Sequence, residues 1–397
     1  MQNDKYCTMK RIRILHTADI HLDASFASLG VNAHIGNQLR AAQRRVFSSI
    51  VGRARDWPAD LVLISGDLFD SPEVKSETVA FVTEALEHLA PIPICIAPGN
   101  RDPYIENSPY ATTLWPENVT IFTPGEWQQS PLSSQDICVH GIGCDGKDDS
   151  GSWFNTLKIK TDRRIHVAVA HGTERTHQSS HGKCFAPFDA ADIAQKGLAY
   201  LALGHFHDAC EVKGDFSTAI HYPGTPQGRN FQEQGNRSFL EVNIEATASG
   251  RVSVRVTPVS CADITFQTYT CPVGTGKDPQ GDMDKIIEGD PARQVVQLRV
   301  TGRLAPPAYE YIESLRKYAQ NRFLYAEIVD AVERSANAPA VVGQCTCLSK
   351  FNEAMTGRIA DASDRDTALF EAYARDLAIV ACRSHALPNH EAEDALS

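Results

Sequence analysis

Short apolar runs rich in β-branched residues recur through the first 210 residues, and each run ends in a polar cluster. The runs are RIRIL at 11–15, LVLIS at 61–65, IPICIA at 92–97, HVAVA at 166–170 and YLALG at 200–204. Runs of this length are typical of buried strands. Segments with helical periodicity, at 36–57 and 76–90, lie between them. Strands that alternate with helices predict an α/β layered domain.

The pattern changes after about residue 210, where strands with turns replace the alternation of strands and helices. Segments 237–245 and 250–259 look like a hairpin-linked pair of strands that completes a sheet. A strand, a helix and a second strand are predicted at 293–304, 306–322 and 323–332. We therefore expect a first domain at 1–260, a small α/β domain at 261–335, and a linker with a C-terminal helical segment at 336–397.

The composition is that of an ordinary globular protein, with 42% hydrophobic and 22% charged residues among 397. No apolar run approaches the roughly 18 residues that a membrane helix needs, and the N-terminal segment lacks the apolar stretch of a signal peptide. The eleven cysteines are scattered, which favours reduced thiols over disulfides. We expect a cytoplasmic protein, nucleoid-associated if bacterial, with no membrane partner.

The net charge of −11 argues against a surface coated for nucleic-acid binding. A carboxylate-rich metal centre contributes negative charge of its own, which bound divalent ions would neutralise. The composition therefore neither supports nor excludes a nucleic-acid substrate.

Candidate metal ligands follow each of the five predicted strands. They are Asp19, His21, Asp67, Asn100, His171, His205 and His207. In open α/β sheets, ligands gather beyond the carboxyl ends of the strands, so residues distant in sequence can converge there. A mixture of carboxylate, imidazole and amide groups suits divalent manganese, iron or zinc better than thiophilic metals. The sequence therefore predicts a divalent metal centre at these strand ends.

Five motifs follow one another in the order D-x-H, GD, GN-x-D, HG and GH-x-H, each directly after an apolar run. They stand in HTADIHLDASF, LVLISGDLFDS, APGNRD, VAVAHG and LGHFH, within residues 11–208. This arrangement resembles the calcineurin-like metallophosphoesterases. The segment HYPGTPQGRNFQEQG at 221–235 is more narrowly similar to the DNA repair exonucleases of the SbcD/YhaO type, the nuclease partners of SMC-like ATPases. The resemblance implies a four-layer α/β/β/α sandwich with a small C-terminal α/β capping domain at about 261–335.

The same resemblance implies two divalent metal ions, most typically Mn²⁺, with Fe²⁺, Zn²⁺ or Mg²⁺ as alternatives. One ion would be held by Asp19, His21 and His207, and the other by Asn100, His171 and His205. Asp67 would bridge both, as suits two cations about 3.5–4 Å apart. In the segment at 221–235, Arg229 and Asn230 are the expected substrate-binding residues.

Arg101 departs from the family's pattern, in which a histidine follows the asparagine and contacts the phosphate or helps to protonate the leaving oxygen. Arginine stays protonated and cannot supply that proton, but it can bind a phosphate oxygen bidentately. We expect Asp102 to position Arg101 by a hydrogen bond, as a partner in catalysis. Asp70 occupies a position that related nucleases fill with either His or Asp.

Three interpretations of Arg101 remain open. It is a phosphate clamp in an active nuclease, or it marks slow or redirected activity, for example on activated phosphodiesters. In the third interpretation the protein is a metal- and DNA-binding scaffold subunit that does not cut. The favoured hypothesis is a two-metal-dependent phosphodiesterase that hydrolyses DNA as an exo- and endonuclease in repair, together with an SMC-like, SbcC-type ATPase. A small-molecule phosphodiesterase is the competing enzyme.

Further candidate features lie outside the motifs. The helix predicted at 364–384 is either a docking element for the ATPase or an ordinary packed helix, and related nucleases often form homodimers. A basic stretch at 158–164 is either a local DNA contact or a solvated face; its residues are Lys158, Lys160, Arg163 and Arg164. We interpret His140, His166 and His181 as structural or surface residues, because they fall outside the matching positions.

Overall fold

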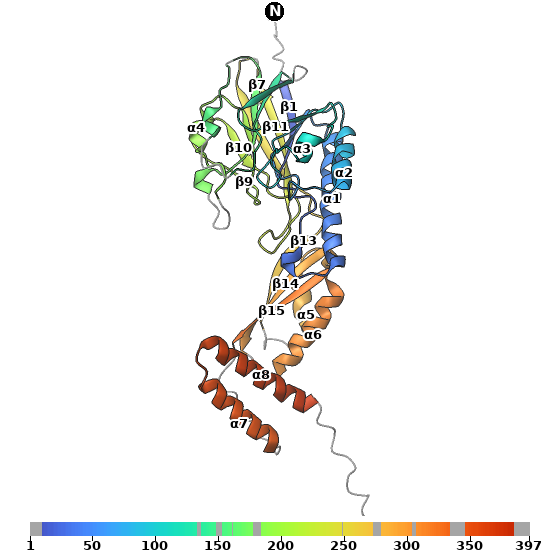
Figure 1. Cartoon of the computed structure of the whole chain (residues 1–397), viewed down its shortest axis with the longest axis vertical. Helices are drawn as coiled ribbons and strands as arrows, with labels where there is room; N and C mark the ends of the chain where they lie inside the picture. Colours follow the sequence, from blue (N-terminus) through green and yellow to red (C-terminus); the bar gives the residue numbers. More distant parts are fainter. Residues whose placement is uncertain are drawn as a thin grey trace, which may run out of the picture. The chain divides into compact units, whose positions relative to one another are not determined.

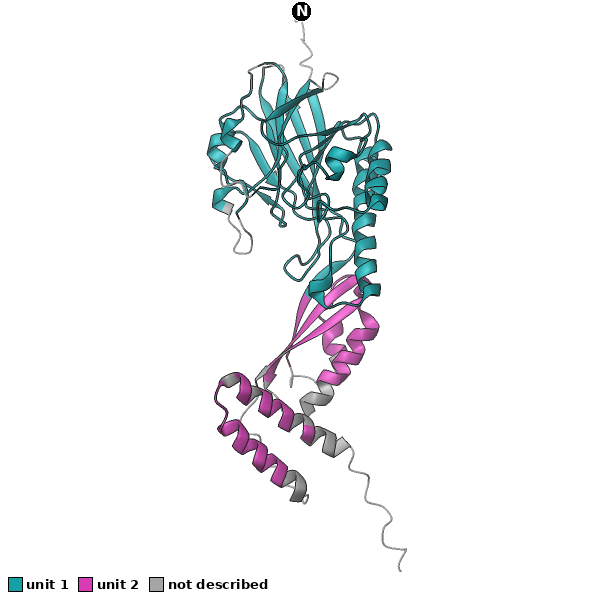
Figure 2. Cartoon of the chain, viewed as in Figure 1, with its two compact units in different colours: residues 1–267 teal, residues 268–397 magenta. Residues whose placement is uncertain are grey.

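The computed structural model describes residues 10–132, 136–147, 153–160, 162–177, 184–247, 249–272, 279–303, 307–333 and 346–384 (Figure 1). The chain divides into two compact units, residues 1–267 and 268–397 (Figure 2). The domain limits expected at 260 and 335, and the capping role of the second domain, stay predictions. In the described part, no helix is long and apolar enough to cross a membrane.

The first unit contains two six-stranded sheets. The first sheet has the order β12–β11–β1–β2–β3–β4. Its strands are β1 (Lys10–Thr17), β2 (Leu61–Ile64), β3 (Ile94–Ile96), β4 (Val119–Ile121), β11 (Ser238–Ala246) and β12 (Val252–Ser260). Strands β1 to β4 are mutually parallel, and β11 is antiparallel to both β1 and β12. The predicted hairpin-linked pair therefore completes this sheet.

The second sheet has the order β5–β6–β7–β8–β10–β9. Its strands are β5 (Gln128–Leu132), β6 (Ile137–Gly141), β7 (Ile165–His171), β8 (Tyr200–Gly204), β9 (Cys210–Glu211) and β10 (Ala219–Tyr222). Strands β6, β7, β8 and β10 are parallel, while β5 and β9 pair antiparallel at the two edges. The five strands predicted from the apolar runs are confirmed, and the mixed α/β class with parallel sheets is confirmed with them.

One hydrophobic core packs between the two sheets. Alternate residues of β1 and β2, such as Ile14 and Leu63, contact alternate residues of β6 to β8, such as Val139 and Val167. All four are fully buried. Since successive side chains of a strand point to opposite faces, each sheet has a second apolar face to cover.

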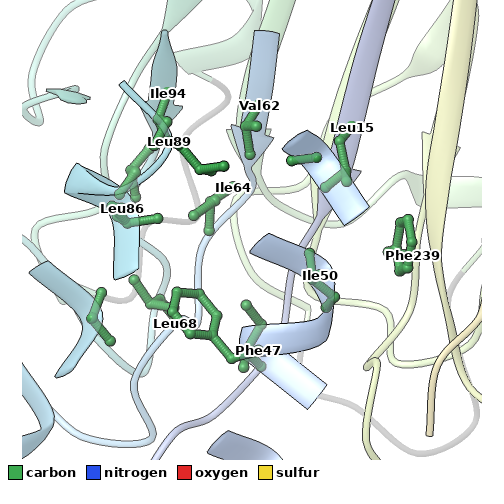
Figure 3. Packing of buried hydrophobic residues seen from close by; sticks show 14 of the residues in the cluster. Leu15, Phe47, Ile50, Val62, Ile64, Leu68, Leu86, Leu89, Ile94 and Phe239 are labelled. Carbon is green, nitrogen blue, oxygen red and sulfur yellow. The ribbon is translucent and has the colours of Figure 1, made fainter. Parts of the chain in front are cut away.

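Two helices cover the outer face of the first sheet. The helices are α1 (Ala33–Asp56) and α2 (Ser76–Glu87). Phe47 and Ile50 of α1 and Leu86 of α2 pack in one cluster with Val62 and Ile64 of β2 (Figure 3). Asn32 caps α1, because its side chain accepts a hydrogen bond from the backbone N–H of Ile35 at 3.0 Å. The two helices predicted from periodicity are therefore confirmed.

The outer face of the second sheet is covered differently from the regular helical layer that we expected. Its cluster draws side chains from loops, from the short 3-10 helix η2 (Trp153–Thr156) and from the five-residue helix α4 (Ala190–Ala194). Among the side chains that the structure describes, none from the short 3-10 helix η3 (Arg175–His177) belongs to it. Phe154 and Phe188 stack there with ring centroids 3.9 Å apart. Bulky aromatic side chains fill this face in the described residues, so the sequence shows little helical periodicity there. The four-layer description itself stays a prediction.

The second unit contains a three-stranded sheet of order β13–β14–β15. Its elements are β13 (Thr265–Pro272), which crosses the division between the units, α5 (Pro279–Asp284), β14 (Gln294–Arg303), α6 (Pro307–Arg322) and β15 (Tyr325–Glu333). The predicted strand, helix and strand are present, with β14 parallel to β15. Leu298, Leu315 and Phe323 lie in its core.

Two helices follow in the second unit, α7 (Thr346–Ala360) and α8 (Arg365–Ser384). They contact each other, and Arg358 forms an ion pair with Glu371. The helix α8 was predicted, whereas α7 lies in a segment that we expected to be part of a linker. The remaining short elements of the chain are η1 (Ala27–Leu29), α3 (Pro109–Thr112) and η4 (Pro291–Arg293).

Gly204, at the end of β8, sits where the two sheets approach each other most closely. A Cβ atom there would lie 1.8 Å from the carbonyl oxygen of Ser65 and 2.8 Å from His171 Nδ1. We expect Gly204→Ala to lower the free energy of unfolding by about 3 kcal/mol or more, because backbone must move to admit the methyl group. Chemical denaturation measures the change.

Gly52 in α1 is the matched control, since a Cβ there meets nothing within 4 Å. Gly52→Ala should raise the free energy of unfolding by about 0.5–1 kcal/mol through helix propensity. Equal effects of the two substitutions would contradict the close approach of the sheets.

Candidate metal centre

Five strand ends from the two sheets converge on one site. In the first sheet, Thr17, Ile64 and Ile96 are the last residues of β1, β2 and β3 and lie in register. In the second sheet, His171 and Gly204 end β7 and β8 and pair with each other. The carboxyl ends of parallel strands meet at one edge, so the polar residues that follow them are brought together.

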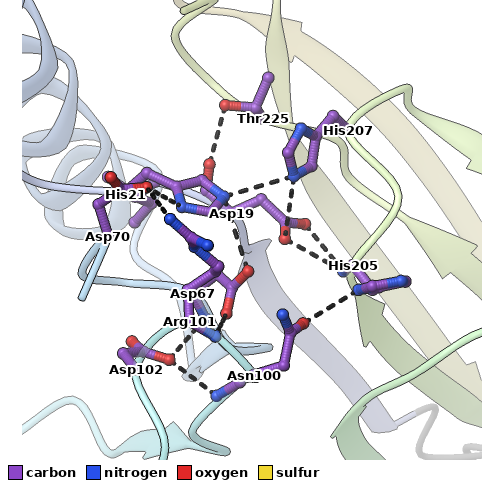
Figure 4. A network of polar contacts seen from close by, with 12 residues as sticks. Asp19, His21, Asp67, Asp70, Asn100, Arg101, Asp102, His205, His207 and Thr225 are labelled. Carbon is purple, nitrogen blue, oxygen red and sulfur yellow. Dashed lines mark hydrogen bonds and ion pairs between the residues drawn. The ribbon is translucent and has the colours of Figure 1, made fainter. Parts of the chain in front are cut away.

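Asp67 lies at the middle of this polar network (Figure 4). Its Oδ2 atom is 3.7 Å from His21 Nε2 and 3.6 Å from His171 Nε2. His21 Nε2 is also 3.4 Å from His207 Nε2, which lies 3.9 Å from Asp19 Oδ1. Ligand atoms gather in two overlapping groups, Asp19 with His21 and His207, and Asp19 with Asp67 and His171. The oxygen and nitrogen ligand atoms of these residues thus lie within a few ångströms of one another.

Asn100 and His205 extend the network on the side of His171. Asn100 Oδ1 lies 2.8 Å from His171 Nε2 and 3.1 Å from His205 Nδ1. The backbone N–H of His205 donates to both carboxylate oxygens of Asp19, at 3.1 Å each. All seven residues predicted as ligands therefore lie in one connected site, although their division between two ions stays a prediction.

Hydrogen bonds orient two of the histidines for ligation. His171 Nδ1 donates to the carbonyl of Ser65 at 2.9 Å, which leaves the Nε2 lone pair directed at Asp67 and Asn100. His207 Nδ1 donates to Glu233 Oε1 at 2.7 Å, which leaves Nε2 directed at Asp19 and His21. Fixing one ring nitrogen in this way sets the tautomer in known metal sites.

Burial keeps two of the imidazoles, those of His21 and His171, neutral. It lowers the pKa of His171 to about 4 and holds the pKa of His21 well below its usual range. A neutral imidazole has the lone pair that a metal ion requires.

Glu233 is a site residue that the sequence analysis missed. It is buried, and its Oε1 also accepts from Arg229 Nη2 at 3.0 Å. Burial raises the pKa of Glu233, but the hydrogen bonds and charges of His207 and Arg229 outweigh burial and hold it at about 2. Its position four residues after Arg229, in a segment already singled out, was the only available signal.

Three buried carboxyl groups stand close together at the site. Burial, reinforced by the charge of Asp67, raises the pKa of Asp19 well above its usual range and that of Asp102 to about 7. Burial raises the pKa of Asp67 to about 6, against a lowering by the backbone N–H of Arg101. Carboxylates buried without a counter-charge are costly, so divalent cations fit this donor set chemically. Its oxygen and nitrogen donors suit manganese, iron or zinc.

The backbone at the ligands adopts an uncommon conformation. Asp19, His21 and Asp67 each have a φ of 51°, in the left-handed region, and His205 has a φ of 108°. Backbone hydrogen bonds hold the first two, from Asp19 N to Gly66 O at 3.0 Å and from His21 N to Asp67 O at 2.9 Å. Such residues persist only where their surroundings fix them, and they cluster at functional sites.

Asp102 does not position Arg101 as expected. Its two carboxylate oxygens accept from the backbone N–H groups of Asp67 at 3.0 Å, Phe69 at 3.0 Å and Gly99 at 2.8 Å. The hydroxyl of Tyr110 donates to it at 2.6 Å. Asp102 therefore ties the loop after β2 to the loop after β3, and its role is to position Asp67.

Arg101 contributes to the site through both its backbone and its side chain. Its backbone N–H donates to Asp67 Oδ1 at 2.8 Å, a bond that any residue other than proline can make. Its side chain is 55% exposed, and its Nη2 lies 3.8 Å from Asp70 Oδ1. The guanidinium is thus loosely held at the edge of the site, where it can reach a bound anion.

Asp70 and Arg229 form a buried pair beside the ligands. Arg229 Nη1 lies 3.2 Å from Asp70 Oδ1, and the same oxygen is 3.0 Å from His21 Nδ1 at an angle too bent for a hydrogen bond. The charge of Arg229 is matched by Asp70 and Glu233, two carboxylates that lie beside the metal ligands and are not among them. Asp70 therefore holds Arg229 by an ion pair and lies against His21.

A cleft of about 740 Å³ opens over the network. Its lining includes His21, Asp67, Arg101, Arg229 and Asn230. Asn230 Oδ1 accepts from the backbone N–H of Gln232 at 2.8 Å, which shapes the loop at the mouth of the cleft. The two residues predicted to bind substrate thus reach the cleft, and their contact with a substrate stays a prediction.

Comparison with known proteins agrees with this geometry. Residues 12–209 match the family model for calcineurin-like phosphoesterases. This part of the chain is a calcineurin-like metallophosphoesterase domain. The family consists of metal-dependent phosphoester hydrolases, which accounts for the ligand-type residues around Asp67.

One curated relative and one solved structure illustrate the similarity of this metallophosphoesterase. The chain is 25% identical over 243 residues to the uncharacterized metallophosphoesterase YhaO of Bacillus subtilis, covering 59% of this chain and 57% of that protein. It thus spans little more than half the length of that relative. The crystal structure of TT1561 of Thermus thermophilus shares 13% identity, covering 62% of this chain and 98% of TT1561, with a TM-score of 0.37. A likeness at that level supports no conclusion.

The remaining candidate residues lie outside the network. Lys158, Lys160 and Arg163 are exposed, whereas Arg164 forms an ion pair with Asp162 at 2.6 Å. The basic stretch is therefore partly neutralised. His140 and His166 are buried in β6 and β7, and His181 lies outside the described residues.

The buried carboxyl groups predict a distinctive pH dependence for metal-free protein. Folding raises the pKa values of Asp67 and Asp102 from 3.8 to about 6 and about 7, so the folded state binds protons more tightly than the unfolded state. Their contribution to the free energy of unfolding is full below about pH 4 and is lost as pH rises through about 7, at roughly 1.4 kcal/mol per pKa unit. Excess Mn²⁺ should restore stability above pH 7. Thermal unfolding at pH 5 and pH 8, with chelator or Mn²⁺, measures both effects.

Asp67→Asn removes one of the two titrating groups and is the control. The difference between pH 5 and pH 8 should shrink in this variant when chelator is present. If Mn²⁺ shifts the thermal unfolding midpoint of the wild-type protein equally at pH 5 and pH 8, the raised pKa values assigned to Asp67 and Asp102 are contradicted.

Glu233→Gln tests the bond that orients His207. The variant keeps the size of the side chain but loses the charge that holds His207 Nδ1–H and Arg229. Because partners of this kind tune metal affinity, we expect Mn²⁺ to bind about 10–100-fold more weakly. Glu245→Gln, at a half-exposed position of β11, should leave the affinity unchanged. Calorimetric titration with Mn²⁺ measures the affinity of both variants. If Glu233→Gln and Glu245→Gln bind Mn²⁺ equally well, Glu233 has no role in the site.

Proposed function

We propose that the chain is a two-metal-dependent phosphodiesterase that hydrolyses DNA, as an exo- and endonuclease in DNA repair. One observation carries the proposal: seven ligand-type side chains from five strand ends meet around the buried carboxylate of Asp67, at the floor of an open cleft. This is the donor set that a pair of divalent ions needs to act on a phosphodiester.

In this proposal the seven residues are assigned to two ions. Asp19, His21 and His207 would hold one, Asn100, His171 and His205 the other, with Asp67 shared by both. When bound, two divalent ions, proposed to be Mn²⁺, would polarise the phosphodiester as Lewis acids and activate the attacking water. The protein's contribution is to hold these donors rigidly, which it does through Asp102, Glu233 and the carbonyl of Ser65.

Arg101 is the proposed phosphate clamp. Its exposed guanidinium lies at the cleft with only a 3.8 Å ion pair to Asp70, so it can turn toward a non-bridging phosphate oxygen. A fixed positive charge there stabilises the charge that develops in the transition state. Arginine does not protonate the leaving oxygen, so that proton comes from water or from another group of the cleft.

DNA is the proposed substrate because the segment 221–235, which resembles the corresponding segment of SbcD/YhaO-type nucleases, contributes side chains to the site. Arg229 and Glu233 of this segment fix His207, while Asn230 lies at the mouth of the cleft. The exposed residues Lys158, Lys160 and Arg163 offer positive charge to a phosphate backbone in a chain whose net charge is −11. The capping domain expected at 261–335 would help to position the DNA.

An SMC-like, SbcC-type ATPase is the proposed partner, and a homodimer and a cytoplasmic location are part of the same proposal. Helix α8 exposes two aromatic side chains, Phe370 at 69% and Tyr373 at 42%. Exposed aromatic residues on an amphipathic helix suit docking to another helix.

A non-cutting scaffold is the second candidate, and Arg101 is the observation that favours it. The backbone N–H of residue 101 orients Asp67 whatever the side chain, so the metal centre would persist after a change that removes the proton donor. The nuclease and the scaffold would bind the same metal ions and differ only in whether DNA is cleaved.

One assay separates these candidates. The full chain with Mn²⁺ is given labelled duplex, hairpin and single-stranded DNA, and separately a chromogenic phosphodiester. We expect metal-dependent cleavage of DNA that Asp67→Asn abolishes. Arg101→Ala should lower kcat/KM by about 10–100-fold, the worth of a charge-assisted hydrogen bond, whereas Arg55→Ala, an exposed arginine of α1, should not.

The other outcomes identify the alternatives. If the wild type is inactive and Arg101→His cuts DNA, the scaffold interpretation is correct. If only the chromogenic ester is hydrolysed, the substrate is a small molecule. DNA binding that does not weaken with added salt would also count against DNA as the substrate.

A further inference from the structure

Three side chains of metal-ligand type lie together on the second sheet, apart from the metal centre described above. Cys138 and His140 are on β6, and His166 is the residue of β7 that pairs with Cys138. Because the intervening Val139 and Val167 face the core between the sheets, these three point to the opposite face. Their exposed fractions are 0%, 1% and 7%. One ligand atom from each lies within 4.8 Å of the others.

The hydrogen bonds of the two histidines determine where their protons are. His166 Nε2 donates to Asp162 Oδ1 at 3.1 Å, so His166 Nδ1 carries a lone pair. His140 Nε2 lies 3.0 Å from His166 Nδ1 and donates its proton to the lone pair there. His140 Nδ1 is then an acceptor, and it is buried with no hydrogen-bond partner in the described structure. Hydrogen bonding thus leaves the buried pair incompletely satisfied.

The geometry matches that of a small transition-metal site. Two imidazole nitrogens bound at about 2.0–2.1 Å on a tetrahedral ion lie about 3.3 Å apart, close to the 3.0 Å seen here. Asp162 is itself held by Arg164, whose Nη2 lies 2.6 Å from Oδ2. A carboxylate that fixes the second nitrogen of a histidine is the usual support of a metal-ligating imidazole. One thiolate with two imidazoles suits zinc rather than the harder ions of an all-oxygen site.

A fourth ligand position is available at the edge of the sheet. Gln129 of β5 pairs with His140, and its exposed side chain places Oε1 4.0 Å from Cys138 Sγ. Water or this amide oxygen can therefore complete a tetrahedral shell.

We propose that Cys138, His140 and His166 form a zinc site that joins β6 to β7 and is independent of the catalytic centre. Binding replaces the proton shared by the two imidazoles with the metal ion, moves that proton to His140 Nδ1, and releases the thiol proton of Cys138 to solvent. Binding therefore strengthens as pH rises. In metal-free protein, burial raises the pKa of the Cys138 thiol, so this group is a poor nucleophile and has no evident role in hydrolysis.

Cobalt is the probe that distinguishes this site from the catalytic centre. The full chain, freed of metal and kept reduced, is titrated with Co²⁺ and its ultraviolet and visible absorption recorded. Only a thiolate ligand gives a sulfur-to-cobalt charge-transfer band, and the seven residues around Asp67 include no cysteine. We expect this band in the wild type, with one Co²⁺ per chain contributing to it, and its disappearance when Zn²⁺ is added.

Variants identify the ligands. Cys138→Ala and His166→Gln should abolish the band, whereas Asp67→Asn in the catalytic centre and Cys184→Ala, an exposed thiol that lines the cleft over that centre, should keep it. Asp162→Asn retains all three ligands and should weaken Zn²⁺ binding about 10–100-fold in competition with a chelator. A purely structural role for Asp162 would leave that affinity unchanged.

Two results would overturn the proposal. The first is the lack of a charge-transfer band in folded wild-type protein at saturating Co²⁺, which requires no variant to fold. The second is a band that persists in Cys138→Ala. Neither result bears on whether the protein cleaves DNA, because the band reports the thiolate alone.

Discussion

Asp19, Asp67 and Asp102 are buried together, and much of the first unit is arranged around that fact. Three carboxyl groups out of contact with water repel one another and are costly to ionise, as the raised pKa values of all three show. Burial keeps His21 and His171 neutral beside Asp19 and Asp67, and the nearby Arg229 is already paired with Asp70 and Glu233. Much of the positive charge that would stabilise these carboxylates would therefore come from bound cations. The site is therefore a pre-formed receptor for divalent ions, and the folded chain is more stable when it holds them.

The rigidity of the receptor depends on Asp102. By accepting hydrogen bonds from three backbone N–H groups and from Tyr110, it connects the loop after β2 with the loop after β3. The bridging position of Asp67 follows from this connection. Residue 101 orients Asp67 through its backbone N–H alone, so the side chain there is free to differ without disturbing the metal ligands. This explains how an arginine stands in a site that is otherwise complete.

The sequence predicted the parts of the molecule that local patterns determine. Apolar runs ending in polar residues marked β1, β2, β3, β7 and β8, and the ligands follow directly because the ends of parallel strands converge. The roles of Asp102 and Glu233 could not be predicted in this way, since their partners are up to 35 and 26 residues distant. Helix α7 was missed because Asn352, Thr356 and Gly357 weaken its helical signal.

The side chains that cover the second sheet were not predicted either. Its outer face is filled by stacked aromatic rings from loops and turns, and such packing has no period along the sequence. Cys138, His140 and His166 were each interpreted as ordinary residues for a related reason. Their proximity depends on the register of β6 with β7, which the sequence does not reveal.

The left-handed backbone at Asp19, His21 and Asp67 has a consequence for how such a chain changes over generations. Glycine or asparagine would adopt the same conformation at lower cost, so each replacement would be tolerated by a protein needed only for its shape. Mutations that relieve strain are common and accumulate where nothing opposes them. Aspartate and histidine at these three strained positions are therefore what metal binding requires and what the fold alone does not.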